Sequence, residues 1–217
     1  MGHPLFLSFQ VALVATALAG VLGIALAGLL SRTKFLGRDL IDALVSAPMV
    51  LPPTVLGFYL LKLLGRESAV GKTFESLFGA PLVFSKSAAI VAAFVAALPF
   101  VVKSSRAAME DVDPSLLDAA STLGASPFRR FISVVLPLSR NGILAGLSLA
   151  FARALGEFGI TLMIAGNLPG ITQTGSLALY DAVLANRNAD ANAIATVMAA
   201  FALVVLYGCT KLVRGKR

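Results

Sequence analysis

Two ionisable residues, Arg153 and Glu157, stand four positions apart inside an apolar run that extends from Asn141 to Gly166. In an α-helix this spacing places both side chains on one face, where they can form an ion pair. An unpaired arginine at mid-membrane costs roughly 3 kcal/mol or more, so such residues are candidates for a functional site. Two interpretations fit the pair: a lining or gate of a solute pathway, and an internal salt bridge that holds neighbouring helices in register.

A second irregular feature, the sequence Pro52, Pro53 and Thr54, interrupts another apolar run. Proline frees backbone carbonyls, which at membrane depth are tolerated where they line a cavity or find a partner. We expect these carbonyls and Thr54 to border a pathway. A plain kink that serves only helix packing is the alternative.

The sequence offers no other set of residues for catalysis. The only histidine is His3, near the start of the chain, and the only cysteine is Cys209, which excludes an internal disulfide. Residues 65–73 resemble a phosphate-binding P-loop, but five residues instead of four separate the two glycines and no strand precedes them. We therefore expect no catalytic residue, no bound cofactor and no metal, and a chain that is not an enzyme.

The composition predicts that these residues lie in an integral membrane protein. Of 217 residues, 58% are hydrophobic and only 13% are charged, with a mean hydropathy of +0.88. Such a chain has too little polar surface for a soluble domain, so residues 1–217 are expected to form a single transmembrane domain. A helix needs about 20 residues to cross the hydrocarbon core. The segments that qualify, or nearly qualify, are Ser8–Leu30, Leu40–Leu64, Ser87–Val102, Asn141–Ala165 and Ala193–Val213.

The fold class predicted is thus an all-α membrane protein with five transmembrane helices. The stretch Ser176–Ala185 could add a short sixth, re-entrant helix. Lysines and arginines gather after the first and third segments and at the C-terminal end. This bias predicts that the N-terminus lies outside and the C-terminus inside. It also accounts for the net charge of +7, so we expect a lipid bilayer as a partner and no nucleic acid.

Residues 109–137, between the third and fourth segments, are predicted to form two short helices, and we call them the elbow. Asp113 and Pro114 are start signals, Gly124 suits a left-handed C-cap, Ser126 and Pro127 repeat the start, and Pro137 ends the second helix. The elbow could be a DNA-binding helix-turn-helix, a capped surface loop or a docking element. Its place between membrane spans argues against DNA, and Leu and Phe at helical spacing favour docking in a partner's groove.

The elbow also carries a family signature. The pattern D-A-A-x3-G-x9-V-x-L-P, from Asp118 to Pro137, resembles the EAA loop of ABC-importer permeases, E-A-A-x3-G-x9-I-x-L-P. Asp118 replaces the usual Glu and Val134 the usual Ile. The stretches 47–61, 151–159 and 167–183 resemble the permease subunits of molybdate ABC importers, so the resemblance covers nearly the whole chain.

The resemblance implies a type I ABC importer permease fold in a multi-pass protein of the bacterial cytoplasmic membrane. It implies a homodimer with the pathway along its axis, cytoplasmic ABC ATPase subunits that receive the elbow, and an extracytoplasmic molybdate-binding protein that delivers the oxyanion substrate. ATP hydrolysis would belong to the separate ATPase subunits. The residues implied for ATPase coupling are Asp118, Ala119, Ala120, Gly124, Leu136 and Pro137.

Two alternatives remain at this point. Tungstate or sulfate could replace molybdate within the same class of transporter. An ion-coupled secondary transporter, with Arg153 and Glu157 as a relay, would need no ATPase partner.

Overall fold

The computed structural model describes residues 2–32 and 35–214. All regular elements assigned within these ranges are helical, which confirms the predicted fold class. The long helices are α1 (Gly2–Arg32), α5 (Lys86–Glu110), α9 (Arg140–Leu155) and α12 (Asn188–Arg214). The shorter helices are α2 (Arg38–Val50), α3 (Pro53–Leu64), α4 (Ala69–Phe78), α10 (Gly159–Ile164) and α11 (Gly175–Leu184). The elbow contains α6 (Pro114–Thr122), α7 (Pro127–Arg130), the π-helical turn η1 (Phe131–Val135) and the start of α8 (Leu136–Leu138).

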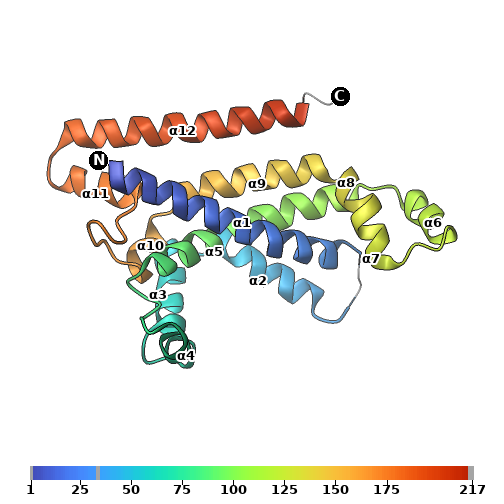
Figure 1. The fold of residues 1–217 in the computed structure, drawn as a ribbon, viewed down its shortest axis with the longest axis horizontal. Coiled ribbons are helices and arrows are strands. Elements are labelled where there is room, and N and C mark those ends of the chain that lie inside the picture. The colour runs from blue at the N-terminus through green and yellow to red at the C-terminus, as the bar shows by residue number, and fades with distance from the viewer. Residues whose placement is uncertain (1, 33–34, 215–217) are drawn as a thin grey trace.

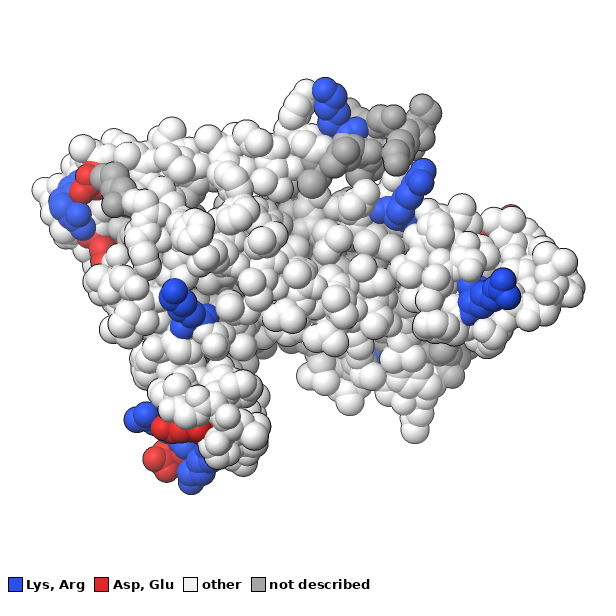
Figure 2. All heavy atoms as spheres, in the orientation of Figure 1, with Lys and Arg blue, Asp and Glu red and all other residues white. Residues whose placement is uncertain are grey.

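The long helices run lengthwise through the molecule, and α5 packs between α1 and α9 (Figure 1). The elbow lies at one end, where α1 and α5 end and α9 begins, and we call this the elbow end. The helices α3, α4, α10 and α11 lie toward the opposite end, which we call the far end. On the face drawn in Figure 2, charged side chains lie toward the far end and on the projecting α4, and again over the half toward the elbow end, with a band between the two groups that shows none. An uncharged band between charged ends is the surface expected of a membrane domain.

Within the described ranges, α1, α5 and α12 are each long and apolar enough to cross a membrane. The count reaches five when two bent helix pairs are each taken as one span. One pair is α2 with α3, bent by 119°, and the other is the 127–138 segment with α9, bent by 72°. The predicted five spans are therefore reached only with bent helices. The stretch expected as a sixth helix forms α11, whose 10 residues are too few to cross.

The fourth predicted segment, Asn141–Ala165, is wrong as a single helix. It forms α9 and α10, which are separated by a break at residues 156–158. Gly156 is a poor helix former, and the carboxylate of Glu157 accepts a hydrogen bond from the Ile160 N–H at 2.7 Å. A side chain that binds a free N–H in this way starts a new helix rather than continuing the old one.

Small residues let α5 approach its neighbours closely. The stripe Ala15, Ala19, Gly23 and Ala27 on α1 is buried. A Cβ atom added at Gly23 would lie 2.9 Å from Val101 of α5. On α9, a Cβ atom at Gly142 would lie 2.3 Å from the Cβ atom of Ala108. Helix association in lipid depends on such close contacts, because acyl chains are as apolar as the side chains and the hydrophobic effect does not drive the helices together.

We predict that Gly142→Ala destabilises the protein, because the added methyl group overlaps Ala108 and the helices must separate. Overpacking of this kind costs about 1–3 kcal/mol. The thermal midpoint of the purified protein in detergent should fall. Gly208→Ala on α12 is the matched control, since nothing lies within 4 Å of a Cβ atom there. Equal midpoints for the two variants would contradict the close packing of α9 on α5.

Candidate functional site

The first half of the elbow begins as its sequence predicts. Asp113 is the N-cap of α6, and its carboxylate accepts a hydrogen bond from the Ser115 N–H at 2.9 Å. This hydrogen bond lowers the pKa of the Asp113 carboxyl group, so the cap is ionised at neutral pH. Pro114 occupies the first helical turn, where its missing N–H leaves no lost bond.

Gly124 ends α6 in the left-handed conformation, with φ +80°. Its N–H donates to the carbonyl of Ser121, and the N–H of Ala125 donates to the carbonyl of Ala120. These two bonds form a Schellman motif, which satisfies carbonyls at the helix end and reverses the chain. The predicted turn at Gly124 is therefore confirmed.

The second half begins as predicted but does not end as predicted. Ser126 caps α7 through the Arg129 N–H, and Pro127 opens the helix. Pro137 was expected to end this helix, and that expectation is wrong, because α8 continues to Leu138. The helix widens before the proline, with the Leu136 N–H bonded to the carbonyl of Phe131, five residues back. The π-helical turn η1 thus precedes a proline that cannot donate a hydrogen bond of its own.

The elbow presents apolar side chains to solvent. Leu123 is 88% exposed, and Leu116, Phe128 and Ile132 are exposed as well. Asp118 and Ala119 lie on this surface, and Ala120 is half-buried. Among the described residues nothing covers these side chains. Large apolar side chains grouped on a short helical surface are typical of a docking site.

The elbow is anchored to the long helices by a small hydrophobic cluster. Ala27 of α1, Met109 of α5, Val135 of η1 and Ile143 of α9 are its buried members. Phe131 and Leu136 pack against it from the elbow. Pro137, the last residue of the signature, is exposed. A displacement of the elbow therefore acts directly on α1, α5 and α9.

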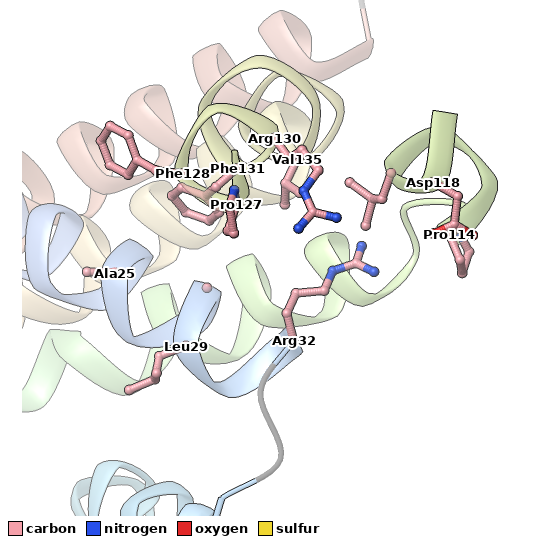
Figure 3. Close-up of a pocket in the computed structure, with 12 residues that line it drawn as sticks. Ala25, Leu29, Arg32, Pro114, Asp118, Pro127, Phe128, Arg130, Phe131 and Val135 are labelled. Carbon is pink, nitrogen blue, oxygen red and sulfur yellow. The ribbon is translucent and has the colours of Figure 1, made fainter. Parts of the chain in front are cut away.

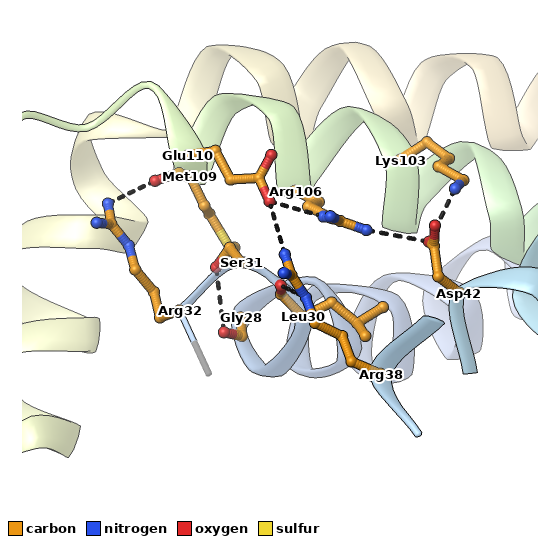
Figure 4. Close-up of polar contacts among 10 residues, drawn as sticks. All are labelled: Gly28, Leu30, Ser31, Arg32, Arg38, Asp42, Lys103, Arg106, Met109 and Glu110. Atoms are coloured by element: carbon orange, nitrogen blue, oxygen red, sulfur yellow. Dashed lines mark hydrogen bonds and ion pairs between the residues drawn. The ribbon is translucent and has the colours of Figure 1, made fainter. Parts of the chain in front are cut away.

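A network of charged side chains joins α2 to α5 at the elbow end (Figure 4). Lys103 and Arg106 lie 2.8 and 3.1 Å from Asp42. Glu110 lies 2.8 Å from Arg106 and 3.4 Å from Arg38. Partly exposed pairs of this kind contribute little stability each, about 0.2–1 kcal/mol, so their effect is mainly to fix geometry.

Two arginines also cap helix ends in the same region (Figure 4). Arg32 donates to the carbonyls of Met109 and Val112, where α5 ends. Arg38 donates to the carbonyl of Leu30, near the end of α1. A cation at a helix C-terminus satisfies free carbonyls and favours the helix dipole.

Sequence reasoning missed this region. The third segment was expected to end at Val102, before its charges, whereas α5 continues to Glu110. Lys103, Arg106 and Glu110 recur at spacings of three and four, which places them on one helix face. That periodicity was the available signal. Their partner Asp42 is 61 residues away from Lys103, so the pairing itself has no local signal.

The predicted pair Arg153 and Glu157 does form. Arg153 Nη1 lies 2.6 Å from Glu157 Oε2, with the side chains 30% and 2% exposed. The pair lies across the break between α9 and α10, not within one helix as expected. Glu157 therefore has two roles, as the counter-charge of Arg153 and as the acceptor for the Ile160 N–H in the first turn of α10.

The break after α9 meets the break at Pro52–Pro53. Helix α10 packs against α3, and a Cβ atom added at Gly159 would lie 2.7 Å from Pro53 Cβ. One added at Gly57 would lie 2.6 Å from Met163 Cβ. Pro52, Pro53 and Thr54 are exposed on the surface of this chain. The structure thus brings Pro53 near the Glu157 break, while Asp118 to Pro137 lie at the elbow end.

A polar clamp holds the loop that precedes α11. Asn167 donates to one carboxylate oxygen of Asp181 and Gln173 to the other, both at 2.7 Å. Thr172 bonds the carbonyl of Gly166 within the loop. These contacts give structural roles to Asn167, Thr172, Gln173 and Asp181, for which the sequence alone indicated none.

Comparison with known proteins agrees with this architecture. Residues 19–214 match the family model described as "binding-protein-dependent transport system inner membrane component". The molybdenum transport system permease protein ModB of Haemophilus influenzae is 44% identical over 80% of this chain and 76% of its own. The sulfate transport system permease protein CysT of Salmonella typhimurium is 35% identical over 93% of this chain and 72% of its own.

The fold is also similar to a solved transporter. A chain of the inward-facing MetNI methionine ABC transporter superposes with a TM-score of 0.75 at 16% identity, covering 98% of this chain and 94% of that one. The family model spans nearly the whole chain, and the relatives are matched over most of their length. The chain belongs to the family of inner membrane components of binding-protein-dependent transport systems.

Proposed function

We propose that this chain is the permease subunit of an ATP-driven molybdate importer and that two copies form a pathway between them. The observation that carries the mechanism is the elbow, a capped pair of helices that is anchored to α1, α5 and α9 and exposes an apolar surface. The substrate is inferred from the molybdenum permease relative. In this proposal the elbow end is cytoplasmic, the N-terminus lies outside and the C-terminus inside.

The elbow is the proposed seat of the ATPase subunits. Asp118, Ala119 and Ala120 would contact the partner, and Gly124 would hold the turn between the two helices. The hydrophobic cluster around Val135 makes the elbow move with the long helices. Closure of the ATPases on ATP would thereby tilt those helices and open the pathway outward, where a molybdate-binding protein delivers the oxyanion.

The pathway is proposed to pass the two helix breaks. Pro52, Pro53 and Thr54 lie on an exposed surface that faces away from this subunit's own core. Arg153, at the break between α9 and α10, is partly exposed, and Glu157 balances its charge. A balanced pair would let an anion pass without trapping it, and selectivity would then lie with the binding protein.

Sulfate is the second candidate substrate, because the sulfate permease relative covers 93% of this chain at 35% identity. The ion-coupled alternative has no support, since the family consists of components of binding-protein-dependent systems.

Uptake by the reconstituted transporter tests the proposed substrate. Vesicles that contain this permease, its ATPase and its binding protein should accumulate molybdate only with ATP. A large excess of sulfate should leave that uptake nearly unchanged, and tungstate should compete. Competition by sulfate at equal concentration would contradict a preference of the transporter for molybdate, and uptake without the ATPase would overturn the mechanism.

Gly124→Val tests the elbow as the ATPase seat. Valine in the left-handed region costs about 1–2 kcal/mol or more, which lowers the population of the native turn roughly five- to thirtyfold. We expect normal membrane insertion but loss of ATPase co-purification and of uptake. Gly79→Val is the matched control, with φ +69° and nothing within 4 Å of an added Cβ atom. An equal loss in both variants would argue against a specific role for the elbow.

Single substitutions of Arg153 and Glu157 should destabilise the protein to different extents. Arg153→Gln leaves the buried Glu157 carboxylate without its counter-charge, and such a loss costs up to about 3–5 kcal/mol. Glu157→Gln keeps an oxygen for the Ile160 N–H and leaves an arginine that reaches solvent, so its midpoint should fall less. Thermal unfolding in detergent measures the midpoints of the two variants and shows which falls further. A pathway role further requires that the stable Glu157→Gln variant alter uptake, and unchanged uptake would leave the pair as an internal salt bridge.

A further inference from the structure

A cavity of about 650 Å³ lies between the end of α1 and the elbow (Figure 3). Ala25, Gly28 and Arg32 belong to the wall formed by α1, and Leu117, Phe128 and Arg130 belong to the wall formed by the elbow. Most of this lining is apolar. The guanidinium groups of Arg32 and Arg130 point toward the same space (Figure 3). The cavity thus combines an apolar wall with two positive charges.

The charges of the cavity favour an anion. Asp118 is the single carboxylate among the lining residues, so the two arginines leave a net positive charge. Arg32 is held in place by carbonyls of Met109 and Val112. Arg130 donates to Ser121, and its buried Nε has no hydrogen-bond partner within the described part of the chain. An anion between the two guanidinium groups would accept hydrogen bonds from their exposed N–H groups and offset the repulsion between like charges.

The position of the cavity at the end of a membrane helix indicates which kind of anion it binds. Its α1 wall begins in the last apolar turns and ends at Arg32, the final residue of the helix. Arginines at the end of a membrane helix lie at the level of lipid headgroups, and basic pockets there bind anionic lipids. A small soluble anion would match the arginines but leave the apolar wall in contact with water. A phospholipid matches both, with its phosphate at the arginines and an acyl chain along α1.

We propose that this cavity binds one anionic phospholipid, with Arg32 and Arg130 at the headgroup and Ala25 and Gly28 beside an acyl chain. The proposal rests on the topology proposed above only for assigning the lipid to the cytoplasmic leaflet. Phe131 already lies against α1 here, since a Cβ atom added at Gly28 would be 2.7 Å from its ring. A lipid beside that contact bridges α1 and α7 and stiffens the attachment of the elbow.

Fluorescence quenching in vesicles tests the proposal on the full-length permease. The chain has no tryptophan, so Phe128→Trp places a single fluorophore at the cavity, on a side chain that is 72% exposed. Brominated phosphatidylglycerol should quench it more strongly than brominated phosphatidylcholine. Adding Arg130→Gln should reduce this preference about fivefold, as expected for one basic residue near a membrane surface. Arg129→Gln is the matched control, because Arg129 is next to Arg130 in the chain but does not line the cavity.

Three results would overturn the proposal. Equal quenching by the two lipids would show no anionic site, and equal effects of Arg129→Gln and Arg130→Gln would show only general surface attraction. Loss of the preference on adding millimolar inorganic phosphate would assign the cavity to a free anion. Retention of the preference in phosphate, together with its loss in Arg130→Gln alone, supports the lipid. The measurement needs no transport, so molybdate uptake by vesicles that hold the unsubstituted permease with its ATPase and binding protein tests the proposed function separately.

Discussion

The structure depends on the contact between the elbow and the long helices. Val135 of the elbow is buried with Ala27, Met109 and Ile143, which come from α1, α5 and α9. Cores of this kind are close-packed, so they transmit displacement instead of absorbing it. Without this contact, a partner bound to the elbow would move only a surface loop. The charged network between α2 and α5 extends the connection to the helix that leads to the Pro52–Pro53 break.

The two helix breaks have a shared physical basis. Pro53 and Gly159 lie against each other, and Gly57 lies against Met163, so each break is held by the other segment. Broken helices are tolerated at membrane depth where other groups satisfy the freed backbone. Glu157 does so directly for the Ile160 N–H. This mutual support explains why two sequence motifs that are about a hundred residues apart both depart from plain apolar helix.

Local chemistry accounts for what could be predicted from the sequence. The caps at Asp113 and Gly124 depend on one residue and its neighbours, and the small-residue stripes repeat with the period of a helix. Pro52 and Pro53 mark where α2 ends, but no local pattern encodes the 119° angle between α2 and α3 or the packing of α3 against α10. Glu157 sits in an apolar run that reads as helix, and its capping role requires the Ile160 N–H in position. Pro137 remains inside a helix because the π-helical turn before it widens the backbone. The residues next to Pro137 in the sequence do not predict this turn.

The orientation and occupancy of the elbow can be measured directly. Replacing Cys209, the only cysteine, and introducing Leu123→Cys places one thiol on the most exposed apolar side chain of the elbow. A membrane-impermeant thiol reagent should label it in inverted vesicles and not in intact cells, and bound ATPase subunits should protect it. Labelling from the outside, or labelling from the inside that the ATPase does not reduce, would contradict the account.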